Sequence, residues 1–272
     1  SRKNQLSTEN HIALYESCKN HTIDYLCSAF DLECLIFINT KFNLRYFKIA
    51  SGEIFSLDIL EYISQIKKPI ILSTGMATYE EIEASIAILN RKFRKEITIL
   101  HCISNYPTPY KDVNLNVIRE LKDRFAYPVG FSDHTIGIEC AIASVSMGAS
   151  IIEKHVTLSR NMSGPDQAAS LEFGEFKTLI EQSRNMVRAM GNGRKEFLPS
   201  EKVLHGVLAK KVVTTMPIRK GEALTPNMIR TMVTKREGGL LPDKYYCVLG
   251  ETTARDLPAN HVLEIGDLVI GS

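Results

Sequence analysis

Short apolar runs alternate with amphipathic stretches along the chain as far as Met190. The runs are rich in isoleucine, valine and leucine, which is typical of strands in a parallel sheet that is buried on both faces. The stretches between them repeat apolar residues at helical spacing. The predicted strands are 24–29, 45–51, 69–74, 97–102, 128–135 and 151–157. The predicted helices are 9–20, 30–36, 57–66, 79–90, 115–125, 139–148 and 173–190.

Six strands that alternate with helices predict an α/β fold with a parallel sheet. Polar residues follow every predicted strand, and this even distribution favours a closed (β/α)₈ TIM barrel over an open sheet, in which one switch point holds the site. A TIM barrel needs eight βα units, whereas the pattern ends near Gly191 after about six. Because the chain begins on a helix that should follow a strand, we expect the two missing units to precede Ser1.

The pattern changes after the sixth unit. Residues 192–208 are rich in turn-forming residues and are expected to be a linker. Residues 209–272 contain two short predicted strands, 212–215 and 262–265, between turns. The expected organisation is a partial barrel over 1–191, the linker, and a small β domain. A domain of about 60 residues is marginal on its own, so we expect it to pack against a partner surface.

The composition is that of an ordinary globular protein, with 272 residues, 44% hydrophobic residues and 24% charged residues. A formal net charge of +2 is too small for a basic stripe that binds nucleic acid. No apolar run approaches the ~18 residues of a membrane span, and the first residues lack the apolar core of a signal peptide. The six cysteines show no C-x-x-C spacing, so we expect free thiols and a cytoplasmic location.

Two histidines are the first candidates for chemistry. His134 and His155 follow neighbouring predicted strands, so we expect them to be close in space. Two imidazoles suit a divalent ion with open coordination positions, such as Mn²⁺. Spacing alone leaves a second interpretation open, because a histidine is more often a hydrogen-bonded core or surface residue. His101 lies one residue inside its predicted strand end, and we interpret it as structural.

Lys48 is the other candidate that stands out. It lies at the end of an apolar strand, where a charge without a partner is costly. This position favours a functional role for its ammonium group.

Six motifs occur in order along the chain. They are KIASG (48–52), ILSTGM (71–76), HCISNYPTP (101–109), GFSDHT (130–135), EKHVT (153–157) and GPD (164–166). Together they resemble the sialic acid synthase family, also called nonulosonic acid synthases, over nearly the whole chain. The resemblance implies a TIM barrel followed by a small antifreeze-like β-clip domain, called SAF. It also implies condensation of phosphoenolpyruvate with an N-acetylated hexosamine such as N-acetylmannosamine, which releases phosphate and forms a nine-carbon keto acid.

The resemblance implies roles for individual residues. His134 and His155 would hold the metal, Mn²⁺, and act in catalysis together with Lys48. The residues that would bind phosphoenolpyruvate are Ser28, which stands where the family often has threonine, Lys48, Ser51, Ser73, Ser104 and Ser132. Those that would bind the sugar are Tyr106, Asp166 and Arg236. Without the resemblance, the serines and Asp166 would be read as turn or cap residues and Arg236 as a solvated charge.

The resemblance places the counterpart of Arg236 on the antifreeze-like domain of a second subunit, which implies a domain-swapped homodimer. Local similarity is weak there, and Lys235 or Arg230 could take its place. The family's first two strands carry a glutamate and a lysine near phosphoenolpyruvate, and this chain has no counterpart to those strands. We therefore expect impaired catalysis from this chain taken alone.

Other interpretations stay open. Another metal-dependent barrel that condenses phosphoenolpyruvate, such as the sugar-phosphate synthases of aromatic biosynthesis, would lack the antifreeze-like tail. A decayed synthase could act as a non-catalytic binding or scaffold protein. Within the family, the acceptor could be N-acetylmannosamine, its 6-phosphate or a diacetamido sugar. Residues 164–170 resemble the sialic and legionaminic branches more than the pseudaminic branch, and the choice between those two stays open.

Overall fold

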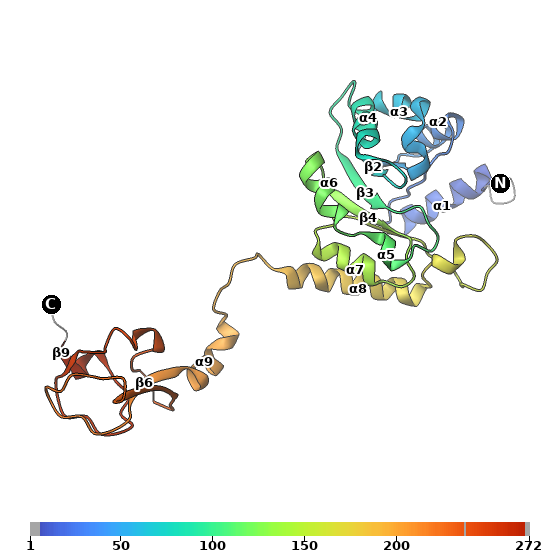
Figure 1. Ribbon diagram of the computed structural model, residues 1–272. Coiled ribbons are helices and arrows are strands. Elements are labelled where there is room, and N and C mark those ends of the chain that lie inside the picture. Colours follow the sequence, from blue (N-terminus) through green and yellow to red (C-terminus); the bar gives the residue numbers. More distant parts are fainter. Residues whose placement is uncertain (1–5, 237, 270–272) are drawn as a thin grey trace. The chain divides into compact units, whose positions relative to one another are not determined.

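The computed structural model describes residues 6–236 and 238–269, and the chain divides into two compact units between Asn192 and Gly193 (Figure 1). The division lies next to the expected end of the barrel domain at residue 191. Within the described ranges, no helix is both long enough and apolar enough to cross a membrane.

The N-terminal unit is built on one parallel sheet of five strands in the order β1-β2-β3-β4-β5. The strands are β1 (Phe47–Ile49), β2 (Ile70–Ser73), β3 (Ile97–Cys102), β4 (Val129–Asp133) and β5 (Ile152–Lys154). Each strand pairs with the next one along the chain, and each connection contains a helix. This repeated unit is that of a TIM barrel, and the curled sheet forms a half-barrel.

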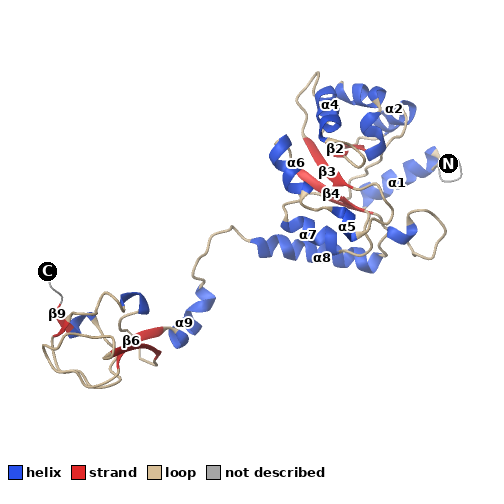
Figure 2. Ribbon diagram, in the orientation of Figure 1, coloured by secondary structure: helices blue, strands red, loops and turns tan. Residues whose placement is uncertain are grey.

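Helices pack around the sheet (Figure 2). They are α1 (Thr8–Asn20), α2 (Leu32–Lys41), α3 (Leu57–Ser64), α4 (Tyr79–Leu89), α5 (Tyr110–Val113), α6 (Val117–Phe125), α7 (Glu139–Ser146) and α8 (Phe173–Met190). The seven predicted helices are confirmed in place, although the one predicted at 30–36 extends to Lys41 as α2. Helix α5 was not predicted. Local capping fixes several starts: Asp31 Oδ1 accepts the N–H of Cys34 at 2.7 Å, and Thr78 forms a capping box with Glu81.

The first predicted strand, 24–29, is wrong as a strand. Only Ser28 pairs with the sheet, through a single parallel bridge to Lys48. A strand requires a ladder of paired backbone groups, and this segment finds a partner at one residue. On the opposite edge, Val156 forms a similar single bridge with Leu171. The other five predicted strands are confirmed in place, but two are much shorter than predicted. The strand predicted at 45–51 is reduced to Phe47–Ile49, just before a 3₁₀ helix over Ser51–Phe55, and the strand predicted at 151–157 is reduced to Ile152–Lys154.

Side chains alternate along the strands between a core and a lumen. Phe47 and Ile49 of β1 belong to the apolar core under the helices, together with Phe131 of β4. Lys48, between the first two, lines a cleft on the other face of the sheet, as does Ser132 beside Phe131. Polar side chains therefore reach the lumen without interrupting the apolar core.

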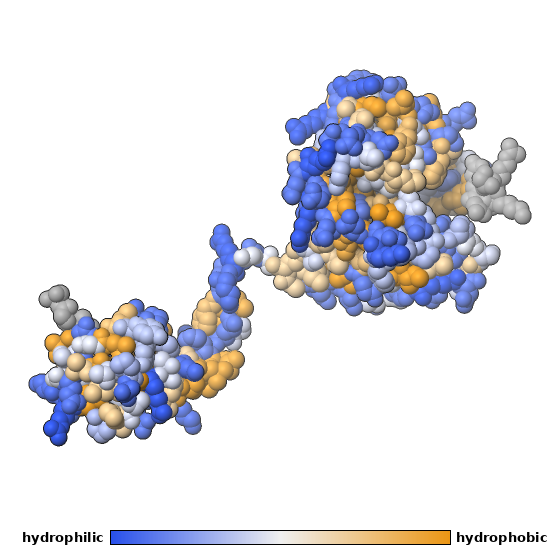
Figure 3. All heavy atoms as spheres, viewed as in Figure 1, coloured by the Kyte–Doolittle hydropathy of each residue, from blue (hydrophilic) through white to orange (hydrophobic). Residues whose placement is uncertain are grey.

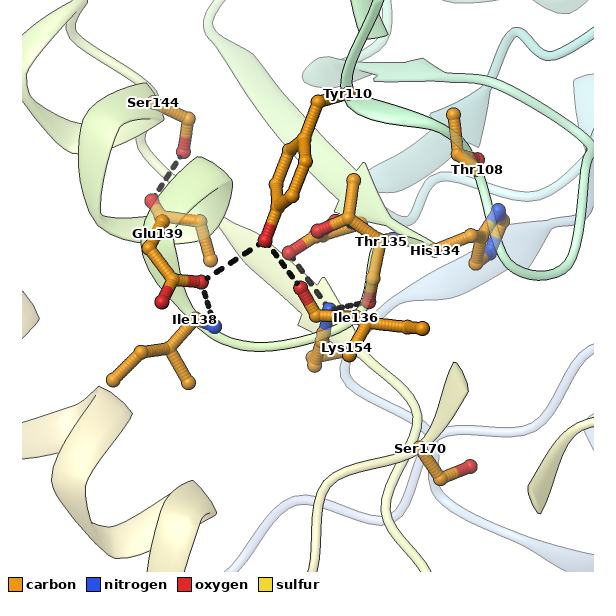
Figure 4. A network of polar contacts seen from close by, with 12 residues as sticks. Thr108, Tyr110, His134, Thr135, Ile136, Ile138, Glu139, Ser144, Lys154 and Ser170 are labelled. Carbon is orange, nitrogen blue, oxygen red and sulfur yellow. Dashed lines mark hydrogen bonds and ion pairs between the residues drawn. The ribbon is translucent and has the colours of Figure 1, made fainter. Parts of the chain in front are cut away.

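A buried ion pair fixes the ends of β4 and β5 to each other. Lys154 Nζ lies 2.9 Å from Asp133 Oδ2, and the two side chains are 1% and 0% exposed. Lys154 Nζ also donates to the carbonyl oxygen of Thr135 at 2.5 Å, and Asp133 Oδ1 accepts the N–H of Thr135 (Figure 4). These bonds hold the backbone on both sides of His134, and so they position that imidazole.

The C-terminal unit contains two short antiparallel pairs. β6 (Lys210–Thr214) pairs with β7 (Ile229–Val233), and β8 (Thr252–Thr253) pairs with β9 (Leu268–Val269). The predicted strand 212–215 coincides with most of β6. The predicted strand 262–265 is wrong, because Val262 forms one bridge to Val213 and a 3₁₀ helix then begins at Ile265.

The segment expected to be a plain linker contains a helix, α9 (Lys202–Leu208). This helix buries none of its side chains, and its surface is largely apolar (Figure 3). The exposed apolar residues on it are Val203, Leu204, Val207 and Leu208.

Asp267 is the buried polar centre of the C-terminal unit. Its Oδ1 lies 2.6 Å from Arg255 Nη2, and its Oδ2 lies 2.7 Å from His261 Nε2 and accepts the N–H of Glu264 at 2.9 Å. Burial acts to raise the pKa of Asp267, but the hydrogen bonds from Glu264, His261 and Arg255 outweigh it and hold the pKa below its ordinary value. The ionised carboxylate therefore links Arg255, His261 and the backbone of Glu264.

We expect Lys154→Met to lower the free energy of unfolding by about 3–5 kcal/mol, because Asp133 becomes a buried charge without a partner. Urea unfolding of the full chain measures this loss. Adding Asp133→Asn removes the charge, keeps the acceptor for Thr135 N–H, and should restore part of the stability. Lys177→Met, on the exposed side of α8, is the matched control. A loss below about 1 kcal/mol for Lys154→Met would contradict a structural role for the pair.

We expect Asp267→Asn to destabilise the C-terminal unit by about 1–3 kcal/mol, measured as faster amide hydrogen exchange over 210–269 in the full chain. Because the folded-state pKa of Asp267 is lowered, its stabilisation is complete above the unfolded pKa of about 4 and is lost as the pH falls through the lower folded pKa. The difference between wild type and variant should therefore shrink below pH 4. Asp243→Asn removes an exposed carboxylate and should have no such effect.

Candidate active site

A cleft of ≈ 610 Å³ opens where the strands of the half-barrel end. Every predicted site residue of the N-terminal unit lines it: Ser28, Lys48, Ser51, Ser73, Ser104, Tyr106, Ser132, His134, His155 and Asp166. These residues come from segments spread over more than half of the unit, and they meet because parallel strands present their carboxyl ends at one edge. Arg236 is an exposed residue of the C-terminal unit, and its predicted role stays a prediction.

Lys48 is the buried cation of the cleft. Its side chain is 7% exposed, and its Nζ donates to Ser73 Oγ at 2.9 Å and to the carbonyl oxygen of Ile49 at 3.2 Å. The ammonium group also lies 3.4 Å from Glu153 Oε2. Two hydrogen bonds and one ion pair orient this buried lysine, so its charge is fixed at one place in the cleft.

Glu153 is a cleft residue that the sequence analysis missed. Its Oε1 accepts a hydrogen bond from Ser132 Oγ at 2.7 Å, while its Oε2 faces Lys48. A sequence signal existed, because residues two apart on a strand point to the same face. Once His155 is assigned to the cleft, Glu153 is expected to face the cleft as well, and Lys154 is expected to point to the opposite face.

The two candidate metal ligands are neighbours. The ring centroids of His134 and His155 lie 5.2 Å apart, and the ring of Tyr106 lies 4.1 Å from that of His134. Burial lowers the pKa of both imidazoles, and the proximity of His134 lowers that of His155 further. These shifts favour the neutral imidazole, which is the form that binds metals.

The donor set of the histidine pair fits a divalent ion. The carbonyl oxygen of Ile103 lies 2.8 Å from His134 Nδ1; because a carbonyl only accepts, Nδ1 carries the proton and Nε2 keeps its lone pair. This is the tautomer that a backbone carbonyl imposes on metal-binding histidines. Within the described part of the chain, no group of three or more His, Cys, Asp or Glu side chains is arranged to hold a metal. Two imidazoles would leave most coordination positions open for other oxygens.

A cradle lined by small side chains lies beside Gly75. The N–H of Gly75 donates to Ser51 Oγ at 3.0 Å, and a Cβ at this position would lie 2.3 Å from Ser104 Oγ. A larger residue here would therefore displace the hydroxyl groups of Ser104 and Ser51. Ser104 Oγ is buried and has no hydrogen-bond partner among the described residues, so it is a donor available to a ligand. The next residue, Met76, lines the cleft with a left-handed backbone (φ 68°), a strained conformation typical of functional sites.

Asp166 and Tyr106 stand at the histidine end of the cleft. Asp166 precedes the 3₁₀ helix Gln167–Ala169, but its side chain makes no capping hydrogen bond there. The simple interpretation of Asp166 as a cap is therefore wrong. His101, in contrast, lies on the core side, where its Nε2 is 2.7 Å from the carbonyl oxygen of Val113 and its ring stacks on Phe131. Its expected structural role is confirmed.

Comparisons with known proteins identify the family of this chain. The NeuB family matches residues 1–195. The N,N'-diacetyllegionaminic acid synthase of Campylobacter jejuni is 40% identical over 265 residues, which cover 96% of this chain and 78% of that protein. The pseudaminic acid synthase of Helicobacter pylori is 35% identical over 260 residues, covering 96% of this chain and 76% of that protein.

Among solved structures, the N-acetylneuraminic acid synthetase of Leptospira borgpetersenii in complex with citrate is 32% identical, with a TM-score of 0.69, over 74% of this chain and 70% of that one. The family match spans the whole half-barrel, and these relatives are synthases of sialic-acid-type sugars. This chain therefore belongs to the NeuB family of sugar-acid synthases.

Proposed function

We propose that the cleft condenses phosphoenolpyruvate with an N-acetylated hexosamine to form a nine-carbon sialic-acid-type sugar, with release of phosphate. The observation that carries this proposal is the meeting of one buried, oriented ammonium group with two adjacent imidazoles in a single cleft. The first suits an anionic substrate, and the second suits a metal-assisted reaction at a carbonyl. The relatives' names supply the class of product.

Phosphoenolpyruvate would lie at the lysine end of the cleft. It carries a phosphate and a carboxylate, which fixed cations and hydroxyl donors bind well. Lys48 would supply the charge, and the serine hydroxyls around it would supply donors. Ser104 Oγ supports this assignment most directly, because it is buried and has no hydrogen-bond partner within 6–236 and 238–269. The other hydroxyls assigned here are Ser28, Ser51, Ser73 and Ser132.

The metal ion, which we propose to be Mn²⁺, would be held by His134 and His155. When bound, it would supply Lewis acidity toward the aldehyde oxygen of the open-chain sugar. Tyr106 and Asp166 would bind the sugar itself, since they line the same end of the cleft. We also propose that the C-terminal unit is an antifreeze-like SAF domain and that Arg236 completes the site of a second subunit in a domain-swapped homodimer.

In the proposed reaction, C3 of phosphoenolpyruvate forms a bond to the aldehyde carbon C1 of the sugar. Water adds at C2 and its spare proton goes to the aldehyde oxygen. The bond between C2 and the bridging oxygen then breaks, so that this oxygen leaves with the phosphorus. The proton of the C2 hydroxyl group goes to the departing phosphate, and C2 becomes a ketone. Lys48 would stabilise the negative charge on the departing phosphate, and electrostatic stabilisation of this kind is usually the largest single contribution to catalysis.

The half-barrel supports the further proposal that a complete enzyme has eight βα units. The segment around Ser28 lies at a sheet edge with a single bridge, and beside it a cleft of ≈ 780 Å³ is lined by apolar side chains such as Phe30 and Phe37. Exposed edges and apolar surfaces of this kind favour pairing or aggregation. We therefore propose that residues 1–272 alone have impaired activity.

A phosphate-release assay tests the proposal. This chain, and a version extended upstream to eight units, would be given phosphoenolpyruvate, Mn²⁺ and a panel of N-acetylated and diacetamido hexosamines. We expect turnover from the extended protein, with the best sugar identifying the branch. If neither protein releases phosphate with any sugar, the synthase function is wrong, and retained partner binding by the folded chain would then favour a scaffold role.

We expect His134→Ala in the active, extended protein to reduce metal-dependent turnover by about 10³-fold or more, because one of two metal ligands is lost. Mn²⁺ binding, followed by isothermal titration, should weaken in parallel. His21→Ala, which removes an exposed histidine at the end of α1, is the matched control. Unchanged turnover in His134→Ala would remove this residue from the metal site.

A further inference from the structure

Both carboxylate oxygens of Glu153 are engaged by groups that we assign to the substrate anion. Oε1 accepts the hydroxyl proton of Ser132 at 2.7 Å, and Oε2 lies 3.4 Å from Lys48 Nζ. The groups that we assign to the substrate anion therefore already bind a carboxylate of the protein itself.

The positive charge of Lys48 is already partnered by the protein. Its Nζ donates hydrogen bonds to Ser73 Oγ and to the carbonyl oxygen of Ile49, and it forms an ion pair with Glu153 Oε2 at 3.4 Å. An incoming phosphate or carboxylate must therefore compete with one of these groups for the ammonium group. The Ile49 carbonyl is part of the sheet, and Ser73 is buried on the neighbouring strand.

Glu153 is the acceptor that can give way. Its side chain is 36% exposed, whereas Lys48 is 7% exposed, so the carboxylate can turn toward solvent at little cost. It is also the acceptor with a negative charge, and two anions close together on one cation repel each other. Its neighbour Lys154 points to the other face and is held by Asp133, so β5 itself need not move.

We propose that Glu153 is a place-holder for the substrate anion: it binds Lys48 and Ser132 in the empty cleft and is displaced when a phosphate or carboxylate enters. The identification of that anion as phosphoenolpyruvate rests on the proposed function. In this role Glu153 is a positioning residue, because it keeps the ammonium group of Lys48 oriented and paired while no substrate is present. An unpaired buried ammonium would be costly.

The place-holder has a measurable consequence. The apparent affinity for an anion is reduced by the fraction of molecules in which Glu153 has left Lys48. If the pair is closed in about nine-tenths of the molecules, the apparent dissociation constant is about tenfold higher than the intrinsic one. Removing the charge of Glu153 should thus strengthen anion binding, whereas a residue that only supports the site would weaken it when replaced.

The test is Glu153→Gln in the full chain. Glutamine keeps an oxygen for Ser132 Oγ but loses the charge that attracts Lys48. Calorimetric titration with inorganic phosphate and with phosphoenolpyruvate, in metal-free buffer at constant ionic strength, measures both dissociation constants. We expect both to fall by about tenfold. Equal or weaker binding by a folded Glu153→Gln protein would overturn the proposal.

Two further variants make the result specific. Asp166→Asn removes one negative charge from the same cleft without touching Lys48. If it strengthens phosphate binding as much as Glu153→Gln does, the higher affinity comes from the lower negative charge of the cleft, and the place-holder proposal is wrong. Glu153→Asp keeps the charge on a side chain one methylene shorter, which cannot hold Ser132 and Lys48 together. We expect it to bind phosphate more tightly than wild type, and this variant decides the matter if Glu153→Gln does not fold.

The outcomes separate this inference from the proposed function. If wild type binds and turns over phosphoenolpyruvate in the extended protein, but the Glu153 variants bind it no more tightly, only the place-holder fails. If the variants gain affinity for phosphate while no hexosamine supports turnover, only the synthase function fails. If no anion binds to any of the proteins, both are wrong.

Discussion

The contact between Lys48 and Glu153 joins the two edge strands of a five-stranded sheet, and it requires that the sheet be curled. Neighbouring strands lie ~4.8 Å apart, so β1 and β5 would be separated by ~19 Å in a flat sheet, too far for a contact of 3.4 Å between their side chains. Curling gathers the carboxyl ends of all five strands around one space. The cleft that Lys48, Glu153 and the histidine pair share is a consequence of that curvature.

Two ion pairs with different roles lie on the two faces of β5. Glu153 and Lys48 meet in the lumen, where one partner is partly exposed and can be exchanged for a ligand. Lys154 and Asp133 meet on the opposite face, where both partners are buried and neither can be replaced without loss. The rigid pair anchors the strand ends, and this anchoring lets the other pair open without disturbing the position of His134.

Much of this arrangement could be predicted from the sequence, because the signals are local. Apolar runs between amphipathic stretches predicted the order of β1 to β5, and polar residues at strand ends predicted most of the cleft. The failures concern pairing, which depends on distant partners. Segment 24–29 has strand-like composition but meets β1 only at Ser28, and 262–265 forms one bridge through Val262. Glu153 was missed because its importance depends on Lys48, which lies 105 positions earlier in the chain.

The sequence Glu153-Lys154-His155 also restricts how this protein can change over evolution. Substitutions on the helices alter one surface position at a time, and loops can absorb extra residues. A single inserted or deleted residue within β5 would instead exchange the two faces. The lysine would then enter the lumen, while the glutamate and the histidine would be forced against the core. Related genes should therefore vary in length between the strands, and the length of β5 itself should stay constant.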